Sequence, residues 1–140
     1  MPLDSRTTLA PPTYDDALAA RARVYAHMRP SPLLKHPLLD DWIGRSAWIK
    51  HENHNPTGSF KIRGGLNLVA QMSEQEKRGG VICASTGNHG QSVAMACRFH
   101  GVRCRIVVPV GNNPDKTAAM RALGAEVQEY GRDFDDAREF

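Results

Sequence analysis

The first third of the chain contains one stretch of helical periodicity and one proline-rich segment. Apolar residues recur every three or four positions from Leu18 onward, which predicts a helix over residues 14–28. Thr13 and Asp16, three residues apart, match a capping box at the start of this helix. Residues 1–12 are rich in proline and small polar residues, and we expect them to form a mobile lead-in.

Closely spaced prolines follow this helix and are expected to end it, since proline cannot continue a helix and restricts the residue before it. They predict an extended connection over residues 29–41, and a short strand is expected at residues 47–50. Helical spacing returns over residues 59–72, after a polar, turn-rich segment. Gly64 and Gly65 are the weakest positions of this helix by intrinsic propensity.

Beyond residue 73 the pattern alternates between short apolar strands and amphipathic helices. The expected elements are a capping box at 73–76, strands at 81–84, 103–109 and 126–130, a loop at 85–90 followed by a helix to about 100, a helix at 114–123, and the first turns of a helix at 133–140. This alternation is typical of an α/β fold with an open parallel sheet in three layers. The last helix lacks a C-cap, which suggests a fragment or a truncated chain.

Composition places the chain among ordinary globular proteins. Hydrophobic residues make up 41% and charged residues 24% of its 140 residues, which excludes the disordered, collagen-like and coiled-coil classes. The net charge is +3 and the basic residues are scattered, so nucleic acid is not an expected partner. The sequence shows neither a secretory signal nor an apolar run long enough to span a bilayer. We therefore expect a soluble, cytoplasmic protein without a membrane partner.

Three cysteines, Cys83, Cys97 and Cys104, indicate a reducing compartment. Their odd number and the lack of a C-x-x-C pair argue against a disulfide framework and a thiolate zinc site. They occur in strand and helix patterns, where they are expected to be small buried hydrophobic residues. No metal is expected elsewhere, because His51 and His54 are three residues apart and helical zinc motifs need a spacing of four.

Lys61 is the strongest candidate for covalent chemistry. With Ser59 as N-cap it would lie in the first turn of its helix, where the helix dipole disfavours an ammonium group. Arg63 would add a second positive charge, and both effects favour the neutral amine that forms Schiff bases. A solvated surface lysine is the alternative from spacing alone. A phosphate-binding P-loop does not fit, because Ile62 follows where serine or threonine is required.

The second candidate is the segment STGNHG at residues 85–90, between a predicted strand and a predicted helix. At the carboxyl end of a parallel strand, such a loop offers free backbone N–H groups, hydroxyls and the positive end of a helix. It is suited to bind an anion, such as a carboxylate or a phosphate, although an ordinary polar loop is the alternative. A GXXG clamp for nucleic acid does not fit, because His89 alone supplies too little positive charge.

Considered as a pair, the two segments resemble a known enzyme family. The motif NPTGSFKIRG at residues 55–64, followed by ASTGNHGQ at residues 84–91, is similar to the fold-type II pyridoxal-phosphate enzymes. The most similar branch is that of the serine/threonine dehydratases, which also contains serine racemases. The resemblance runs from about residue 31 to the end of the chain, and the two motifs in this order and spacing are specific.

The resemblance implies a division of the chain. Residues 1–30 would form the lead-in and a helix, and residues 31–140 the amino-terminal part of a tryptophan synthase β-like fold, with a small α/β domain within about residues 59–140. The glycine-rich cup for the cofactor phosphate and the partner of the pyridine nitrogen lie further along in this family. We therefore expect this chain alone to be incomplete, and the full-length enzyme to be a homo-oligomer.

The resemblance also implies roles for the motif residues. Lys61 would hold pyridoxal phosphate as a Schiff base and would remove the α-proton of an amino-acid substrate. Phe60 would pack near the pyridine ring, and Asn88 would hydrogen-bond the phenolic oxygen of the cofactor. The reaction would be a lyase reaction of amino acid metabolism, β-elimination of L-threonine or L-serine to a 2-oxo acid and ammonia. The residues implied to bind the substrate are Ser85, Thr86, Gly87, Asn88 and His89.

Departures from the family pattern keep other branches open. Serine racemases typically carry serine at the position of Thr86, so threonine there argues against racemisation. His89 separates the loop from the cysteine synthases and threonine synthases, but residues 55–58 are also common in those enzymes. The alternatives to a dehydratase are therefore a serine racemase-like or threonine synthase-like enzyme, and a non-catalytic α/β anion-binding fragment.

Overall fold

The computed structural model describes residues 10–140, so most of the expected lead-in, residues 1–9, lies outside the described part of the chain. Within residues 10–140, no helix has both the length and the apolar character needed to cross a membrane. The elements in chain order are α1 (Tyr14–Tyr25), β1 (Leu33–Lys35), α2 (Pro37–Ile43), β2 (Trp48–Lys50), the 3-10 helix η1 (Glu52–His54), α3 (Lys61–Ala70), α4 (Glu74–Gly79), β3 (Val81–Ala84), α5 (Asn88–Phe99), β4 (Cys104–Val108), α6 (Pro114–Ala122), β5 (Glu126–Glu129) and α7 (Phe134–Arg138).

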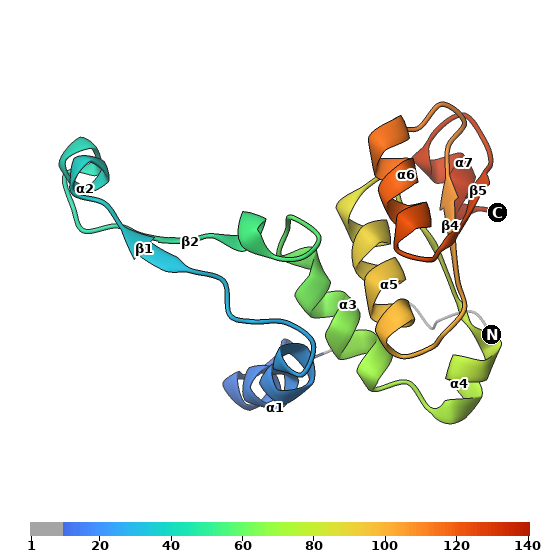
Figure 1. Cartoon of the computed structure of the whole chain (residues 1–140), viewed down its shortest axis with the longest axis horizontal. Helices are drawn as coiled ribbons and strands as arrows, with labels where there is room; N and C mark the ends of the chain where they lie inside the picture. Colours follow the sequence, from blue (N-terminus) through green and yellow to red (C-terminus); the bar gives the residue numbers. More distant parts are fainter. Residues whose placement is uncertain (1–9) are drawn as a thin grey trace.

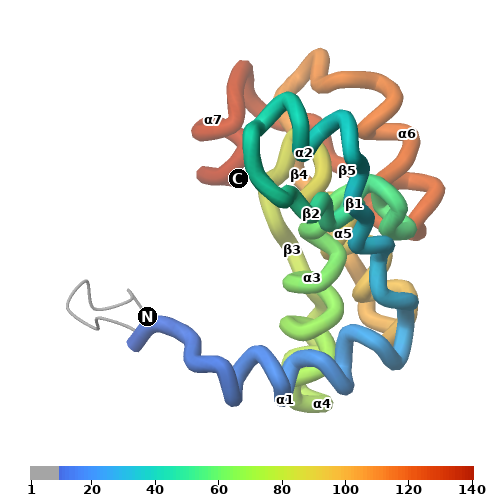
Figure 2. Tube along the Cα trace, turned by 90° about the vertical axis from the view of Figure 1, so that its left-hand side faces the viewer, coloured from blue at the N-terminus to red at the C-terminus, as the bar shows by residue number. Residues whose placement is uncertain are grey.

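Strands β3, β4 and β5 form a parallel sheet in that order. Helices α5 and α6 connect the strands and pack on one face of the sheet, while α7 contacts β3 and β4 (Figure 1). Figure 2 shows α7 on the side of the sheet away from α6. The three layers and the parallel sheet confirm the α/β class predicted from the alternating pattern.

Helix α5 is the centre of the hydrophobic core, because α3 covers one side of it and the sheet covers the other. Ile62, Leu66 and Val69 of α3 are completely buried and belong to one apolar cluster with Val93 and Cys97 of α5. Burying each large aliphatic side chain stabilises the fold by about 1.5–3 kcal/mol, whereas a glycine inside a helix costs about 1 kcal/mol. Packing on α5 therefore offsets the two glycines of α3.

Gly65 is needed where α3 crosses α5. A Cβ atom at this position would lie 2.4 Å from Ser92 Oγ and 2.7 Å from the Ser92 carbonyl oxygen. Gly64 faces open space, with nothing within 4 Å of a Cβ atom built there. Intrinsic propensity therefore does not describe the role of Gly65, whose missing side chain lets the two helices approach.

The proline-rich segment is not the continuous extended connection predicted over residues 29–41. Strand β1 pairs with β2 in antiparallel fashion, and Pro37 then begins helix α2. Proline is tolerated at the first helical position because its missing N–H would have no helical partner there. Gly44, with φ of 75°, ends the helix in the left-handed conformation. Large apolar side chains are exposed on this projecting arm (Figure 1), namely Leu33, Leu34, Leu38, Trp42, Ile43, Trp48 and Ile49.

Helix α1 keeps the predicted capping box, with Thr13 Oγ1 accepting the Asp16 N–H, but it ends at Tyr25 and not at residue 28. After Tyr25 the chain tightens into a turn, in which the His27 N–H donates to the Val24 carbonyl oxygen at 3.2 Å, and it leaves the helix before Pro30 is reached. Met28 is buried in the core although it lies beyond the helix.

Two histidines join the carboxyl ends of α1 and α5. The His27 ring stacks on Phe99 with centroids 4.9 Å apart and meets the His100 ring edge-on at 5.0 Å. His100 Nε2 is buried and has no hydrogen-bond partner in the described chain. Burial, and then the positive charges of His27 and Lys77, lower the pKa of His100 below its usual value.

Gly65→Ala is expected to destabilise the fold by about 1–3 kcal/mol, because the added methyl group overpacks the contact with Ser92. Gly64→Ala is the matched control on the same helix. It should stabilise the fold by about 0.5–1 kcal/mol, since alanine favours the helix and meets no neighbour. Urea unfolding of both variants measures the difference, and equal effects would contradict the assignment of Gly65 to the helix crossing.

The burial of His100 next to His27 predicts that the free energy of unfolding depends on pH. Because its pKa is lowered by folding, the folded state binds fewer protons than the unfolded chain, whose histidine pKa is about 6.5. The contribution is therefore present above about pH 6.5 and is lost as the pH falls toward the folded pKa. Urea midpoints measured from about pH 7.5 down to about pH 5 should show a smaller fall in His100→Gln. His36 is exposed, so the control His36→Gln should keep the pH dependence of the unaltered protein. The same pH dependence in His100→Gln would contradict this interpretation.

Candidate active site

Lys61 is the first residue of α3, and Phe60 is its cap residue. The prediction that Ser59 caps this helix is wrong, because no side chain caps it. Ser59 Oγ is buried without a hydrogen-bond partner in the described chain. The Lys61 side chain is exposed, and its Nζ lies 5.4 Å from the centroid of the Phe60 ring. Within residues 10–140 this amine makes no hydrogen bond or ion pair.

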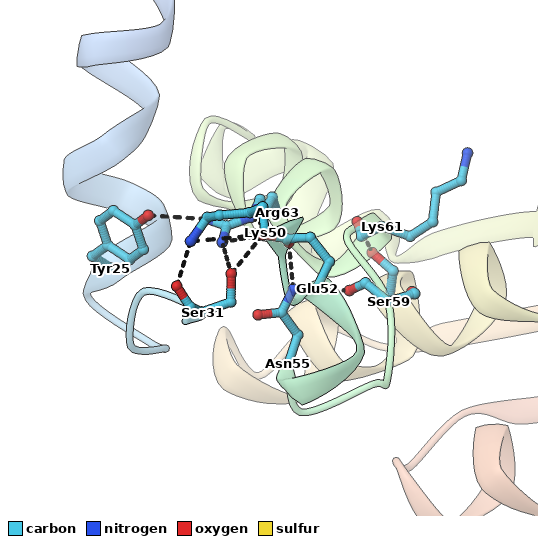
Figure 3. A network of polar contacts seen from close by, with 9 residues as sticks. Tyr25, Ser31, Lys50, Glu52, Asn55, Ser59, Lys61 and Arg63 are labelled. Carbon is cyan, nitrogen blue, oxygen red and sulfur yellow. Dashed lines mark hydrogen bonds and ion pairs between the residues drawn. The ribbon is translucent and has the colours of Figure 1, made fainter. Parts of the chain in front are cut away.

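Arg63 does not act as a second cation beside Lys61. Its guanidinium binds Glu52 in a bidentate pair, with Nε 2.8 Å from Oε2 and Nη2 2.9 Å from Oε1. Figure 3 shows Lys61 extending to the opposite side of α3 from this pair. Residues two apart on a helix do not share a face, so the expectation of adjacent like charges is corrected.

Glu52 is the centre of a polar network that motif reasoning missed. Besides Arg63, its oxygens accept hydrogen bonds from Ser31 Oγ and Asn55 Nδ2, each at 2.6 Å. The hydrogen bond from Arg63 lowers the pKa of Glu52 to about 2 despite the opposing effect of burial, and the bonds from Ser31 and Asn55 add to the shift. The carboxylate therefore stays ionised at neutral pH. Its partners lie as far as 21 residues away in sequence, so no local pattern could reveal them.

The segment predicted as a loop over residues 85–90 is shorter in the structure, because α5 begins at Asn88. Ser85 is buried, and its Oγ accepts the N–H of Gly90 at 2.8 Å and of Gly87 at 3.3 Å. This hydroxyl satisfies amide groups at the start of the helix, which explains why α5 extends into the predicted loop. Thr86 and Gly87 remain in the loop, whereas Asn88 and His89 form the first helical turn.

The start of α5 presents unpaired donors. Within the described chain, the backbone N–H groups of Thr86, Asn88 and His89 have no acceptor. They lie at the positive end of a helix of 12 residues, where the dipole favours an anion. No group of three or more His, Cys, Asp or Glu side chains among residues 10–140 is arranged to hold a metal.

The structure brings the two predicted segments together. Ser92 Oγ donates a hydrogen bond to the Lys61 carbonyl oxygen at 2.6 Å. Ser92 lies four residues after Asn88, so the two residues share one side of α5. The amino-terminal ends of α3 and α5 face the same side of the molecule (Figure 1).

Lys116 of α6 is a further residue at this place. Its Nζ donates a hydrogen bond to Asn88 Oδ1 at 3.0 Å. Because an ammonium group can only donate, the amide oxygen of Asn88 must face Lys116 and the NH₂ group must turn away from it. The sequence predicted the helix that carries Lys116, but it contains no sign that two segments 28 residues apart would meet.

Comparison with known proteins gives one consistent class. The family described as "Pyridoxal-phosphate dependent enzyme" matches residues 24–140. An L-threonine dehydratase of the biosynthetic type from Haemophilus influenzae is 38% identical over 117 residues, which are 84% of this chain and 23% of the relative. An L-threo-3-hydroxyaspartate ammonia-lyase from Saccharomyces cerevisiae is 35% identical over 125 residues, 89% of this chain and 38% of the relative.

Among solved structures, the serine racemase from Dictyostelium discoideum matches with a TM-score of 0.83 and 33% identity over 89% of this chain and 40% of that protein. This similarity confirms the fold-type II architecture expected from the two motifs. The chain spans less than half the length of each of these three proteins.

Ser85→Ala is expected to lower the free energy of unfolding by about 1 kcal/mol, because two amide groups at the start of α5 lose their acceptor. Thr86→Ala is the control, since its exposed hydroxyl makes no hydrogen bond in the described chain. Urea unfolding of the two variants tests the assignment. A loss in Thr86→Ala as large as that in Ser85→Ala would show that the Ser85 hydroxyl is not a specific cap.

Proposed function

Because this chain belongs to the family of pyridoxal-phosphate-dependent enzymes, we propose that its protein converts L-threonine or L-serine to a 2-oxo acid and ammonia by β-elimination. The similarity to an L-threonine dehydratase at 38% identity supports this reaction. The observation that carries the proposal is the unpaired amine of Lys61, on a residue whose carbonyl oxygen is bound to Ser92 of α5, the helix whose first N–H groups are free. When bound, pyridoxal phosphate supplies an electron sink for bond breaking at the α-carbon of the substrate.

The donors around Lys61 fit this cofactor. Lys61 offers the unpaired amine that an aldehyde requires, and the Phe60 ring beside it is 60% exposed and offers an apolar surface. The NH₂ group of Asn88, turned away from Lys116, would donate a hydrogen bond to a phenolic oxygen. We assign cofactor binding in this chain to Phe60, Lys61 and Asn88.

Lys61 would also act as the base at the substrate. Its Nζ forms no ion pair with the described residues, so it can approach the α-carbon without first breaking one. As a neutral amine it would accept the α-proton, while its backbone carbonyl stays bound to Ser92. The catalytic role of Lys61 therefore requires a mobile side chain on a fixed main chain.

The substrate carboxylate would bind at the start of α5. The backbone N–H groups of Thr86, Asn88 and His89 are the donors that lack acceptors. The Ser85 oxygen already accepts two N–H bonds, so only its hydroxyl hydrogen is left to donate. The substrate-binding set is Ser85, Thr86, Gly87, Asn88 and His89.

Racemisation of an amino acid is the second candidate, favoured by the similarity to a serine racemase structure. A racemase needs a second proton carrier on the face of the substrate opposite to Lys61. The hydroxyl of Thr86 is exposed, but it carries a methyl group where serine racemases typically have serine. We therefore rank elimination first, and measurement of D-serine formation separates the two reactions.

Lys61 is expected to carry the cofactor in the full-length protein. Incubation with pyridoxal phosphate, reduction with borohydride and peptide mapping should place the added mass on Lys61, because its amine is unpaired. Lys50 is the internal control, since its Nζ is bound to the Ser31 carbonyl oxygen.

Lys61→Ala should abolish 2-oxo acid formation from L-threonine and L-serine. Label found mainly on Lys50, or steady turnover by Lys61→Ala, would refute the assignment.

A further inference from the structure

Glu52 is placed to influence Lys61 without touching its side chain. The Glu52 carboxylate lies on the side of α3 opposite to the Lys61 amine (Figure 3). It is linked to the main chain on both sides of Lys61, through Asn55 before it and through Arg63 after it. Neither Asn55 nor Arg63 is among the residues proposed to contact the cofactor or the substrate.

The link before Lys61 passes through one amide group. Asn55 Nδ2 donates to Glu52 Oε2 at 2.6 Å and to the Ser59 carbonyl oxygen at 3.2 Å. Asn55 is buried, so both of its N–H donors have protein acceptors in place of water. The turn that leads into Lys61 is thereby fastened to the carboxylate.

The link after Lys61 is the bidentate pair with Arg63, in the first turn of α3. The same guanidinium donates to Tyr25 OH at 3.1 Å and so ties this turn to α1. A bidentate pair between a carboxylate and arginine fixes direction as well as distance. Glu52 therefore holds the helix start from two directions.

The start of α3 has no local means of fixing its own position. No side chain caps the helix, and the hydroxyls of Thr57 and Ser59 are buried without partners in the described chain. A helix of this length usually relies on a capping side chain to satisfy its first N–H groups. α3 lacks such a cap, and Glu52 is instead linked to the turn before Lys61 and to Arg63 after it.

We propose that Glu52, acting through Asn55 and Arg63, is the positioning residue that sets where the Lys61 amine stands relative to the start of α5. This inference rests on the proposed function of Lys61. A displacement of about 1 Å at a reacting group can lower its rate on the order of a hundredfold. Loosening the main chain at residue 61 is therefore expected to slow capture of an aldehyde by Lys61, even when the protein remains folded.

The test measures how fast Lys61 captures pyridoxal phosphate in the full-length apoprotein. Borohydride traps the product at timed intervals, and mass spectrometry gives the ratio of label on Lys61 to label on Lys77 of α4. Glu52→Gln removes the charge at nearly constant shape. Asn55→Ala cuts the link to Ser59 but keeps the ion pair with Arg63, so it remains informative where Glu52→Gln fails to fold.

Two control variants match the substitutions. Glu126→Gln removes an exposed carboxylate paired with Arg105 at 3.0 Å, on the sheet. Asn67→Ala removes an amide that accepts from Arg23 at 2.9 Å, further along α3. Neither residue is linked to the turn before Lys61, so both controls should keep the original ratio.

We expect the Lys61 to Lys77 ratio to fall about tenfold or more in Glu52→Gln and Asn55→Ala, at a temperature where circular dichroism shows both folded. An unchanged ratio in Asn55→Ala would overturn the proposal and leave Glu52 a purely structural residue. Equal losses in Asn67→Ala would also overturn it. Absence of label from Lys61 in the unaltered protein would refute the cofactor lysine itself, a failure that is distinct from an unchanged ratio in the variants.

Discussion

The close crossing of α3 and α5 is the contact on which the rest of the site depends. Gly65 leaves no room for a side chain against Ser92, and Ser92 in turn binds the carbonyl oxygen of Lys61. Ser92 therefore contacts both the glycine at the helix crossing and the main chain of Lys61. Because Asn88 lies one turn before Ser92 on α5, the same contact joins the lysine segment to the first turns of α5.

Paired and unpaired charges lie on different sides of α3. On one side, Glu52 compensates the charge of Arg63 within a partly buried network, and the hydrogen bonds it accepts keep it ionised. On the other side, the Lys61 amine has no counter-ion in the described chain and lies 5.4 Å from the centroid of the Phe60 ring. The pairing spares Glu52 and Arg63 the cost of an uncompensated, partly buried charge. The arrangement also leaves the amine of Lys61 and several N–H groups at the start of α5 without partners in the described chain.

Local patterns predicted much of the fold, and failed at the starts of two helices, α2 and α5. The capping boxes of α1 and α4, the three parallel strands and the helices between them follow from spacing and caps. The prolines around residue 37 were interpreted as breaks, although Pro37 begins α2, because proline is acceptable at the first helical position. Helix α5 begins earlier than predicted, at Asn88, because the Ser85 hydroxyl accepts a hydrogen bond from the N–H of Gly90. Periodicity does not detect this contact.

By itself, the sequence determined the fold class and the two segments that carry the candidate chemistry, since periodicity, caps and motif spacing are local properties of the chain. The cofactor family came from the resemblance of these two motifs to a known enzyme family. Only the tertiary structure decided how the segments meet and which charges are compensated. Arg63 was expected to act on Lys61 and instead binds Glu52, and Lys116 reaches Asn88 from 28 residues away. Such pairings depend on which helix faces turn toward each other, and this direction is set by packing in the core and not by the neighbours in sequence.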